Sequence, residues 1–315
     1  MKPVFFIDLD DTLMPNQHYY KIQQAKMLKY MVGVLWPPGE SLTEPGNPYH
    51  LSRRKRRQLR RTAKELLDEV YDYGYRVPPL FELLESEVVD ETGLLEDILR
   101  KEEELDLKGV ERYRKVGEPY HRERFPTSCR DTYYYFCEQM GVDPDEEVAD
   151  EIYRIGEGFW KTITPGLMWG AARILDYLSE RDHDLHVLTK GDEIVQGHKL
   201  RINRMERWIP EENWHIVSDK DPEVFRRVTS GLDLERVYMI GNSQRSDINP
   251  AIEAGANAIY IPFYTWAHEE SLDFSVTVEE RYALERRGEL LLLENGRRVF
   301  VLPHIKDILD IYEEL

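Results

Sequence analysis

Apolar and polar positions follow two different patterns along the chain. A short apolar run, Phe5–Ile7, ends abruptly in the carboxylates of Asp8, Asp10 and Asp11. A continuous apolar run of this kind is typical of a strand buried in a parallel sheet. From about residue 164, short apolar runs again alternate with helical segments, which predicts parallel β/α units. The pattern therefore predicts an α/β fold with a doubly wound, mostly parallel, Rossmann-like sheet.

Residues 17–163 have a different character, because they are rich in charge and tyrosine and mostly helical in pattern. The first strand and the later strands cannot bury their faces separately, so we expect them to share one sheet. Residues 17–163 are then an inserted α-helical cap placed as a lid beside the acids. The helices predicted in this cap are His18–Val34, Leu51–Tyr73, Leu80–Glu91, Gly93–Leu105, Arg130–Met140 and Pro144–Lys161.

The predicted α/β core consists of residues 1–16 and 164–315, of which 272–315 form a C-terminal hairpin and helix extension. Asn295 and Gly296 lie between apolar runs, which is a hairpin signal. The later predicted strands are Leu185–Leu188, His215–Val217, Val237–Ile240 and Ala258–Ile261. The later predicted helices are residues 164–180, Val195–Trp208, Pro222–Val228, Asp247–Ala254 and Ile305–Tyr312.

The formal net charge of −18 disfavours generic binding to nucleic acid or to an anionic membrane. No apolar run has the length of a transmembrane segment or a signal-peptide core. The two cysteines, Cys129 and Cys137, match no zinc or redox spacing, so we expect reduced thiols in a cytoplasmic protein. The sequence gives no indication of oligomeric state.

The acids after the first strand are the first candidate site. Ligands in open α/β sheets bind beyond the carboxyl ends of the strands. Crowded carboxylates repel one another unless a cation offsets the repulsion. The sequence therefore predicts a divalent metal site with one carboxylate kept free to react.

Three later elements add candidate chemistry. Thr189 ends a strand, and its hydroxyl with the amides of Lys190 and Gly191 can cradle a phosphate; a simple helix N-cap is the alternative. Lys220 precedes a helix that starts at Pro222 and can neutralise a carboxylate, although it can also be a surface lysine. After a third strand, Asn242 and Asp247 offer oxygen ligands for a hard cation.

Taken in order, these elements resemble the four motifs of the haloacid dehalogenase-like superfamily. They read FFIDLDDT, LHVLTKG, SDKDPEVF and GNSQRSD, and the match covers residues 4–15 and about 164–262. In that family a helical cap between the first and second motifs is common, and residues 17–163 look like an unusually long one.

The resemblance implies a role for each site residue. Asp8 is the nucleophile that forms an aspartyl-phosphate, and Asp10 is the general acid and base. Thr189 and Lys220 complete the catalytic set and, with Lys190 and Gly191, bind the phosphoryl group. The implied cofactor is Mg²⁺, and its implied ligands are Asp8, the backbone carbonyl of Asp10, Asn242 and Asp247.

The second acid indicates the reaction class. A halide leaving group needs no proton, whereas an alkoxide does, so Asp10 favours phosphate esters of a small metabolite over halides. Three alternatives stay open: a catalytically weak binding or regulatory protein, a phosphonatase that uses a cap lysine (Lys21, Lys26 or Lys29), and a nucleotide-directed hydrolase. Asn242 stands where many members of the family have an aspartate. Which residue of this loop contacts the metal directly therefore stays open.

Two lysines near the second motif and a basic block in the cap carry further positive charge. Lys190 is placed to touch substrate, whereas we expect Lys199, inside a helix, to be solvated. Residues 53–61 of the cap are strongly basic. They could bind a phosphorylated polymer or nucleotide, but runs of like charge are usually solvated, so we expect a solvated helix face and no nucleic-acid partner.

Overall fold

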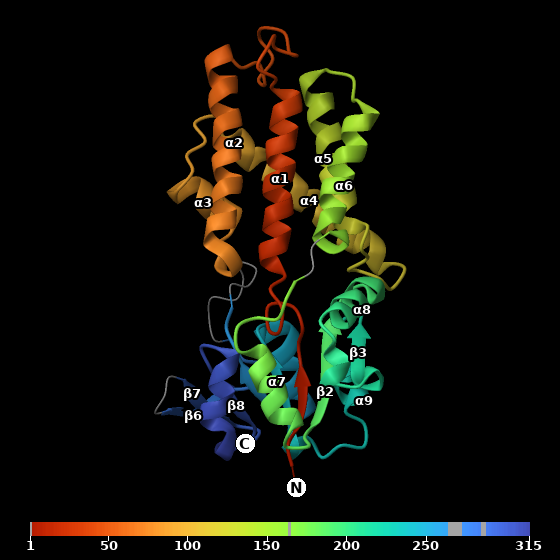
Figure 1. Ribbon diagram of the computed structural model, residues 1–315, viewed down its shortest axis with the longest axis vertical. Helices are drawn as coiled ribbons and strands as arrows, with labels where there is room; N and C mark the ends of the chain where they lie inside the picture. The colour runs from red at the N-terminus through yellow and green to blue at the C-terminus, as the bar shows by residue number, and fades with distance from the viewer. Residues whose placement is uncertain (1, 163–164, 264–272, 285–287) are drawn as a thin grey trace. The chain divides into compact units, whose positions relative to one another are not determined.

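The computed structural model describes residues 2–162, 165–263, 273–284 and 288–315. It divides the chain into two compact units, one of residues 1–16 and 164–315 and the other of residues 17–163. The divisions fall where the sequence pattern changes from β/α to helical and back. We call these units the core and the cap and describe each by itself (Figure 1).

The core contains a sheet that is mostly parallel. Within the described residues it has eight strands in the order β3-β2-β1-β4-β5-β8-β7-β6. All neighbours from β3 to β8 pair in parallel, and only the last two pairs are antiparallel. The strands are β1 (Val4–Ile7), β2 (Asp184–Lys190), β3 (Trp214–Val217), β4 (Val237–Gly241), β5 (Asn257–Tyr260), β6 (Val278–Ala283), β7 (Glu289–Leu293) and β8 (Arg298–Val301).

Helices cover both faces of this sheet, as a doubly wound fold requires. Phe5 and Ile7 of β1 belong to one core cluster, which includes residues of α7 and α11. Val4 and Phe6 belong to the other, which includes residues of α9 and α10. The core helices are α7 (Ala171–Ser179), α8 (Glu193–Ile202), α9 (Pro222–Val228), α10 (Asn249–Ala254) and α11 (Ile308–Ile311).

The strand order locates the place where a ligand can bind. The chain builds outward from β1 to β2 and β3 on one side, and then from β1 to β4 and β5 on the other. The order reverses between β1 and β4, and a crevice opens beyond the carboxyl ends of two strands at such a switch point. Asp8 follows β1 and Asn242 follows β4, so the sequence motifs meet there.

Several element boundaries differ from the sequence predictions. The helix predicted for Val195–Trp208 ends at Ile202, and the one predicted from Asp247 begins at Asn249, after a π-helical turn. Strand β6 was not predicted, because its side chains are mostly exposed and show no apolar face. The hairpin at Asn295 and Gly296 is confirmed by the antiparallel pairing of β7 with β8. Residue 164, the predicted start of a helix, lies outside the described residues.

The cap is helical throughout its regular structure. Helix α1 packs against α2 and α6, and α5 packs against α4 and α6. Cys129 and Cys137 are buried free thiols on α5. The cap helices are α1 (Gln17–Leu35), α2 (Arg53–Tyr73), α3 (Leu80–Ser86), α4 (Leu94–Arg114), α5 (Arg124–Met140) and α6 (Glu146–Lys161). In the part of the chain that the structure describes, no helix has both the length and the apolar character needed to span a bilayer.

Candidate active site

Asp8 is held rigidly at the carboxyl end of β1. Its backbone N–H donates to the carbonyl of Ile240 at 2.9 Å, which extends the pairing of β1 with β4 by one residue. The chain then turns tightly, since the N–H groups of Leu13 and Met14 both donate to the carbonyl of Leu9. Asp11 adopts a left-handed φ of 59° in this turn, and its carboxylate accepts from the N–H of Asn16 at 2.8 Å. Asp11 therefore stabilises the turn.

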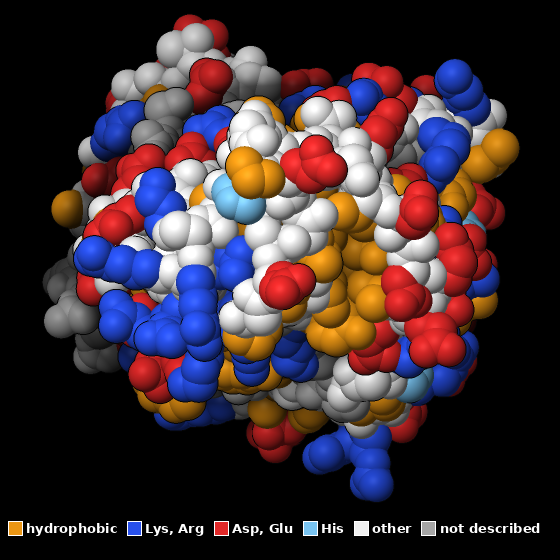
Figure 2. Space-filling model, turned by 90° about the horizontal axis from the view of Figure 1, so that it is seen from above, with side chains coloured by type: hydrophobic (Ala, Val, Ile, Leu, Met, Phe, Trp, Pro, Cys, Tyr) orange, Lys and Arg blue, Asp and Glu red, His pale blue; other side chains and the backbone are white. Residues whose placement is uncertain are grey.

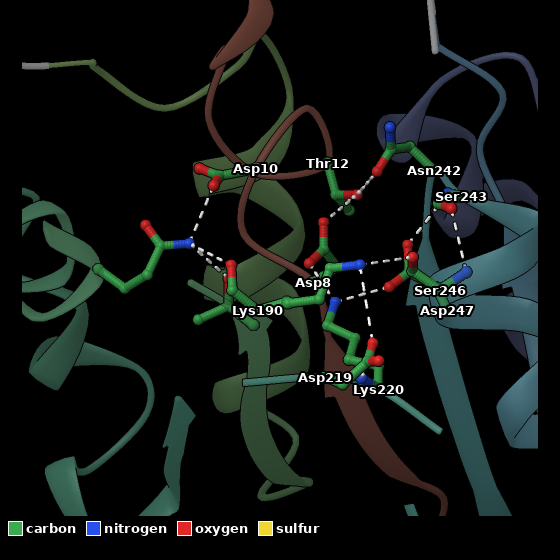
Figure 3. Close-up of polar contacts among 12 residues, drawn as sticks. Asp8, Asp10, Thr12, Lys190, Asp219, Lys220, Asn242, Ser243, Ser246 and Asp247 are labelled. Carbon is green, nitrogen blue, oxygen red and sulfur yellow. Dashed lines mark hydrogen bonds and ion pairs between the residues drawn. The ribbon is translucent and has the colours of Figure 1, made fainter. Parts of the chain in front are cut away.

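Three buried charged side chains meet beside this strand end. The ammonium of Lys220 bridges two carboxylates, with an ion pair to Asp8 and another to Asp247 at 2.6 Å (Figure 3). A side chain at Gly241 would collide with Asp247, so only glycine lets this carboxylate approach so closely. The three side chains are almost completely buried, and they comprise one basic group and two acidic groups.

The burial and the unequal charge shift the pKa values of this cluster. Burial and the neighbouring Asp247 carboxylate raise the pKa of Asp8 to about 7, although Lys220 acts in the opposite direction. For Lys220, burial acts to lower the pKa, but the charges of Asp247 and Asp8 outweigh it and raise it above its usual value. An additional cation near Asp8 would therefore be electrostatically favourable.

A hydroxyl joins Asp8 to the loop after β4. The Thr12 hydroxyl lies 3.1 Å from Oδ2 of Asp8 and 3.2 Å from the amide oxygen of Asn242. Thr12 was not singled out in the sequence, although it closes the first motif. Ser243 donates its N–H to Asp247 at 3.0 Å and caps the π-helical turn, so the loop is rigid at both ends.

The carboxylate of Asp10 is held by helix α8. Nζ of Lys199 donates to Oδ1 of Asp10 at 2.7 Å, and Nε2 of Gln196 donates to Oδ2 at 2.9 Å. The expectation that Lys199 is solvated is therefore wrong: it is 5% exposed and paired with the second acid of the first motif. The signal in the sequence was the spacing of Gln196 and Lys199, which places both on one helix face immediately after the second motif.

The second motif contributes two side chains to the site. Thr189 is fully buried at the end of β2 and accepts from Gln196 at 2.8 Å. The ammonium of Lys190 extends to Ser246 at 3.1 Å and lies 3.9 Å from Asp219 (Figure 3). The sequence prediction for Gly191 needs a correction, because its N–H already donates to the carbonyl of Val217 at 3.0 Å. This N–H is therefore already paired within the sheet and does not serve as a phosphate donor.

The predicted metal ligands are gathered in the same place. Asp8 and Asp247 share Lys220, and the oxygens of Asp8 and Asn242 flank one hydroxyl. Among the described residues, no three His, Cys, Asp or Glu side chains form a metal-binding group. The available donors are two carboxylates, an amide oxygen and backbone carbonyls, all of them hard oxygen ligands. Such a set fits Mg²⁺, which is usually held by one or two carboxylates together with water and substrate.

The basic block lies on helix α2 of the cap. Residues 53–55 are exposed, whereas Arg56 is buried and donates to the carbonyls of Leu51 and Gly39. Arg61 pairs with Glu65 one turn later. Lys and Arg side chains gather on the left in Figure 2, the side on which Figure 1 draws α2. The exposed members fit the solvated helix face that we expected, whereas the buried Arg56 does not and instead stabilises the chain before α2.

Comparisons with known proteins give the fold. No family model matches the chain, and no curated protein matches it. A haloacid dehalogenase-like family hydrolase from Xanthomonas campestris superposes with a TM-score of 0.51 at 20% identity, over 84% of this chain and 83% of that one. A similarity at this identity shows the fold alone, and the chain therefore has the haloacid dehalogenase-like fold.

Two weaker structural matches have TM-scores below 0.5. One is a predicted phosphoglycolate phosphatase from Haemophilus somnus, with a TM-score of 0.46 and 13% identity over 99% of this chain and 98% of that one. The other is an L-2-haloacid dehalogenase from Xanthobacter autotrophicus, with a TM-score of 0.39 and 12% identity over 83% and 78%.

Proposed function

We propose that this protein is a Mg²⁺-dependent phosphomonoester hydrolase that acts through an aspartyl-phosphate on a small phosphorylated metabolite. One observation carries the proposal. A buried carboxylate, Asp8, lies at the switch point of a parallel sheet beside a neutralising lysine, and a second acid, Asp10, follows two residues later with hydrogen-bond partners of its own.

The roles of the residues follow from their positions. Asp8 attacks phosphorus through a carboxylate oxygen, and the bond from phosphorus to the ester oxygen breaks. Asp10 gives its proton to that leaving oxygen and then takes a proton from the water that hydrolyses the acyl phosphate. Lys220 holds Asp8 and offers positive charge to a phosphoryl oxygen. Thr189 and Lys190 add a hydroxyl and an ammonium for the remaining oxygens.

A divalent cation bound by Asp8, Asp247, Asn242 and the carbonyl of Asp10 would supply the charge that lets two anions meet. The raised pKa of Asp8 supports this need, because a nearby cation favours the ionised, nucleophilic form.

The alternatives are less well supported. A halide needs no proton, so the ordered partners of Asp10 favour an ester over a haloacid. A phosphonatase needs a reactive cap lysine, but Lys21 is buried and donates to the carbonyl of Val77 at 2.7 Å, which fits a structural role. A binding protein on this fold would not need the proton-transfer group.

The test is phosphate release from an aryl phosphate by the wild-type protein and by Asp8→Asn, each with and without Mg²⁺. We expect release that depends on Mg²⁺ in the wild type and none above background in Asp8→Asn. Unchanged release in Asp8→Asn would refute the mechanism. No release by the wild type from a broad panel of phosphosugars, nucleotides and phosphorylated acids, with tight binding of one of them, would favour the binding protein.

A further inference from the structure

Helix α8 holds both oxygens of the Asp10 carboxylate. Nζ of Lys199 donates to Oδ1 at 2.7 Å, and Nε2 of Gln196 donates to Oδ2 at 2.9 Å. Gln196 donates as well to the hydroxyl of Thr189, so it links the second acid to the phosphate-binding motif. Sequence motifs alone assign no role to either α8 residue.

The local sequence explains how α8 reaches the first motif. Asp192 caps the helix through the N–H groups of Ile194 and Val195, which fixes where α8 starts after β2. Gln196 and Lys199 are then three residues apart and share a face of the helix. Asn203, one turn further, donates to the carbonyl of Pro165 at 2.8 Å. The helix is therefore fixed at both ends while one face meets Asp10.

Packing alone does not account for a lysine at position 199. Its side chain is 6% exposed and its ammonium has two oxygen acceptors, Asp10 and Asn16 at 2.9 Å. Burying an ammonium carries a desolvation penalty, and an apolar residue of similar size would fill the same space without it. The contacts of its ammonium instead indicate that Lys199 fixes the Asp10 carboxylate.

The two contacts differ in strength, and the difference separates the roles of the two oxygens. A hydrogen bond is strengthened when its donor or its acceptor is ionised, so both bonds to an ionised Asp10 gain from its charge. Lys199 adds a full positive charge of its own, whereas Nε2 of Gln196 has two hydrogens for three acceptors, Oδ2 of Asp10, the Thr189 hydroxyl and the Lys190 carbonyl. Lys199 therefore holds Oδ1 more firmly than the neutral amide of Gln196 holds Oδ2. Oδ2 is therefore the oxygen that can give up its hydrogen bond to Gln196 and contact the substrate instead.

We propose that Lys199 is the positioning residue for the acid and base Asp10, that it anchors Oδ1, and that Gln196 holds Oδ2 until a leaving oxygen replaces it. This inference rests on the proposed function. In the first step the Asp8 oxygen bonds to phosphorus, the bond from phosphorus to the ester oxygen breaks, and the proton on Oδ2 passes to that ester oxygen. In the second step the water oxygen bonds to phosphorus, the bond from phosphorus to the Asp8 oxygen breaks, and Oδ2 takes the proton that the water loses.

The effect of Lys199 should depend on the leaving group. Exact placement of an acid matters most when the leaving oxygen is strongly basic, as in an ester of an alcohol, and least when it leaves readily as an anion. We therefore expect the loss of Lys199 to slow the release of a basic leaving oxygen more than that of an activated one.

The experiment compares two esters of similar shape, phenyl phosphate and p-nitrophenyl phosphate, whose leaving groups differ in basicity. The variants are Lys199→Met, which keeps the length of the side chain, and Lys199→Arg, which keeps the charge. Arg201→Met is the matched control, because Arg201 lies on the same helix with its side chain 64% exposed. Thermal midpoints are recorded for all of them.

For Lys199→Met we expect kcat/KM, which reports the step in which the leaving group departs, to fall about 100-fold or more on phenyl phosphate and less than about 10-fold on p-nitrophenyl phosphate. Lys199→Arg should recover most of the loss, and Arg201→Met should match the wild type. An equal fall in kcat/KM on both esters would overturn the proposal, because a purely structural role has no leaving-group dependence.

If the wild-type protein releases no phosphate from either ester, the proposed function fails, and crystal structures then decide the positioning role. A displaced Asp10 carboxylate in Lys199→Met, with the rest of the site in place, would support the anchor. A carboxylate in its wild-type position would overturn it.

Discussion

The core and the cap each hold two acids with one base, but the two clusters are built differently. In the core all three side chains are buried, and Lys220 bridges both Asp8 and Asp247. In the cap, Arg124 and Asp106 form a partly buried pair, while the buried Glu102 accepts from the neutral groups of Gln24 at 2.9 Å and Ser128 at 2.6 Å.

The surroundings of the two clusters explain what each can do. The core acids lie in loops where parallel strands end, and hydroxyl, amide and further charged groups surround them. The cap acids lie within helix α4 and are packed against α1 and α5. Burial and Asp106 raise the pKa of Glu102 to about 8, so at neutral pH its neutral form can be kept as a helix-packing group. Burial alone therefore does not indicate a reaction site; the core acids differ because they follow strands that end at the switch point of the sheet.

The largest expected effect separates the two regions by activity. Asp10→Asn removes the proton donor of the core, so we expect kcat for phosphate release to fall by about 10²–10⁴. Glu102→Gln removes a more deeply buried acid from the cap, and we expect its kcat on the same ester to stay near that of the wild type. Similar losses in both variants would mean that burial of acids in general, and not the core site, supports activity.

Removing the base of each cluster should affect stability unequally. Lys220→Met leaves two buried carboxylates uncompensated, which should lower the free energy of unfolding by about 3–5 kcal/mol. Arg124→Met leaves only Asp106 without its partner, and that side chain is 19% exposed, so the loss should be smaller. Urea unfolding of both variants measures the difference. Added Mg²⁺ should recover part of the loss in Lys220→Met and none in Arg124→Met; recovery in both would argue against a cation site in the core.

The metal site can be sharpened at Asn242. Asn242→Asp adds a negative charge beside Asp8 and Asp247, so we expect Mg²⁺ to bind about tenfold more tightly, which corresponds to about 1.4 kcal/mol. The Mg²⁺ dependence of phosphate release and calorimetric titration both report this change. Asn213→Asp makes the same substitution away from the site and should leave the affinity unchanged. Weaker binding in Asn242→Asp would remove this loop from the proposed ligand set.

The smallest expected effect is a pH dependence in the cap. The pKa of Glu102 is raised from an ordinary 4.5 to about 8 in the folded protein. Its contribution to stability is therefore complete below pH 4.5 and is lost progressively as the pH rises toward 8. Glu102→Gln cannot ionise, so its thermal midpoint should fall less steeply over this range, by about a few degrees. Parallel curves for the two proteins would show that Glu102 is ionised at little cost in the fold.

Sequence reasoning was most successful where local chemistry decides structure. The apolar run before Asp8, Pro222 at the start of a helix, and Asn295-Gly296 in a hairpin each specify their own conformation. Together with the order of the motifs, they were enough to predict the doubly wound sheet and to place Lys220 beside Asp8.

The failures have a common physical cause, which is contact between segments far apart in the chain. Lys199 seemed solvated because no acid lies three or four residues from it along the chain; its partner, Asp10, is 189 residues away. Gly191 seemed able to bind a phosphate, but its N–H donates to the carbonyl of Val217 in the neighbouring strand β3. Strand β6 has no apolar face, and only its pairing with β7 makes it a strand.

The most direct test of the central claim is to look for the phosphoryl group on Asp8. The Asp10→Asn variant should slow the second step, while p-nitrophenyl phosphate, whose leaving oxygen needs little protonation, still allows the first. Brief incubation with this ester and Mg²⁺, an acid quench and peptide mass spectrometry then reveal the intermediate. The account predicts a phosphorylated Asp8 that is removed by hydroxylamine and is absent from Asp8→Asn. Phosphate release by the wild type with no modified Asp8, or the same modification in Asp8→Asn at another residue, would contradict it.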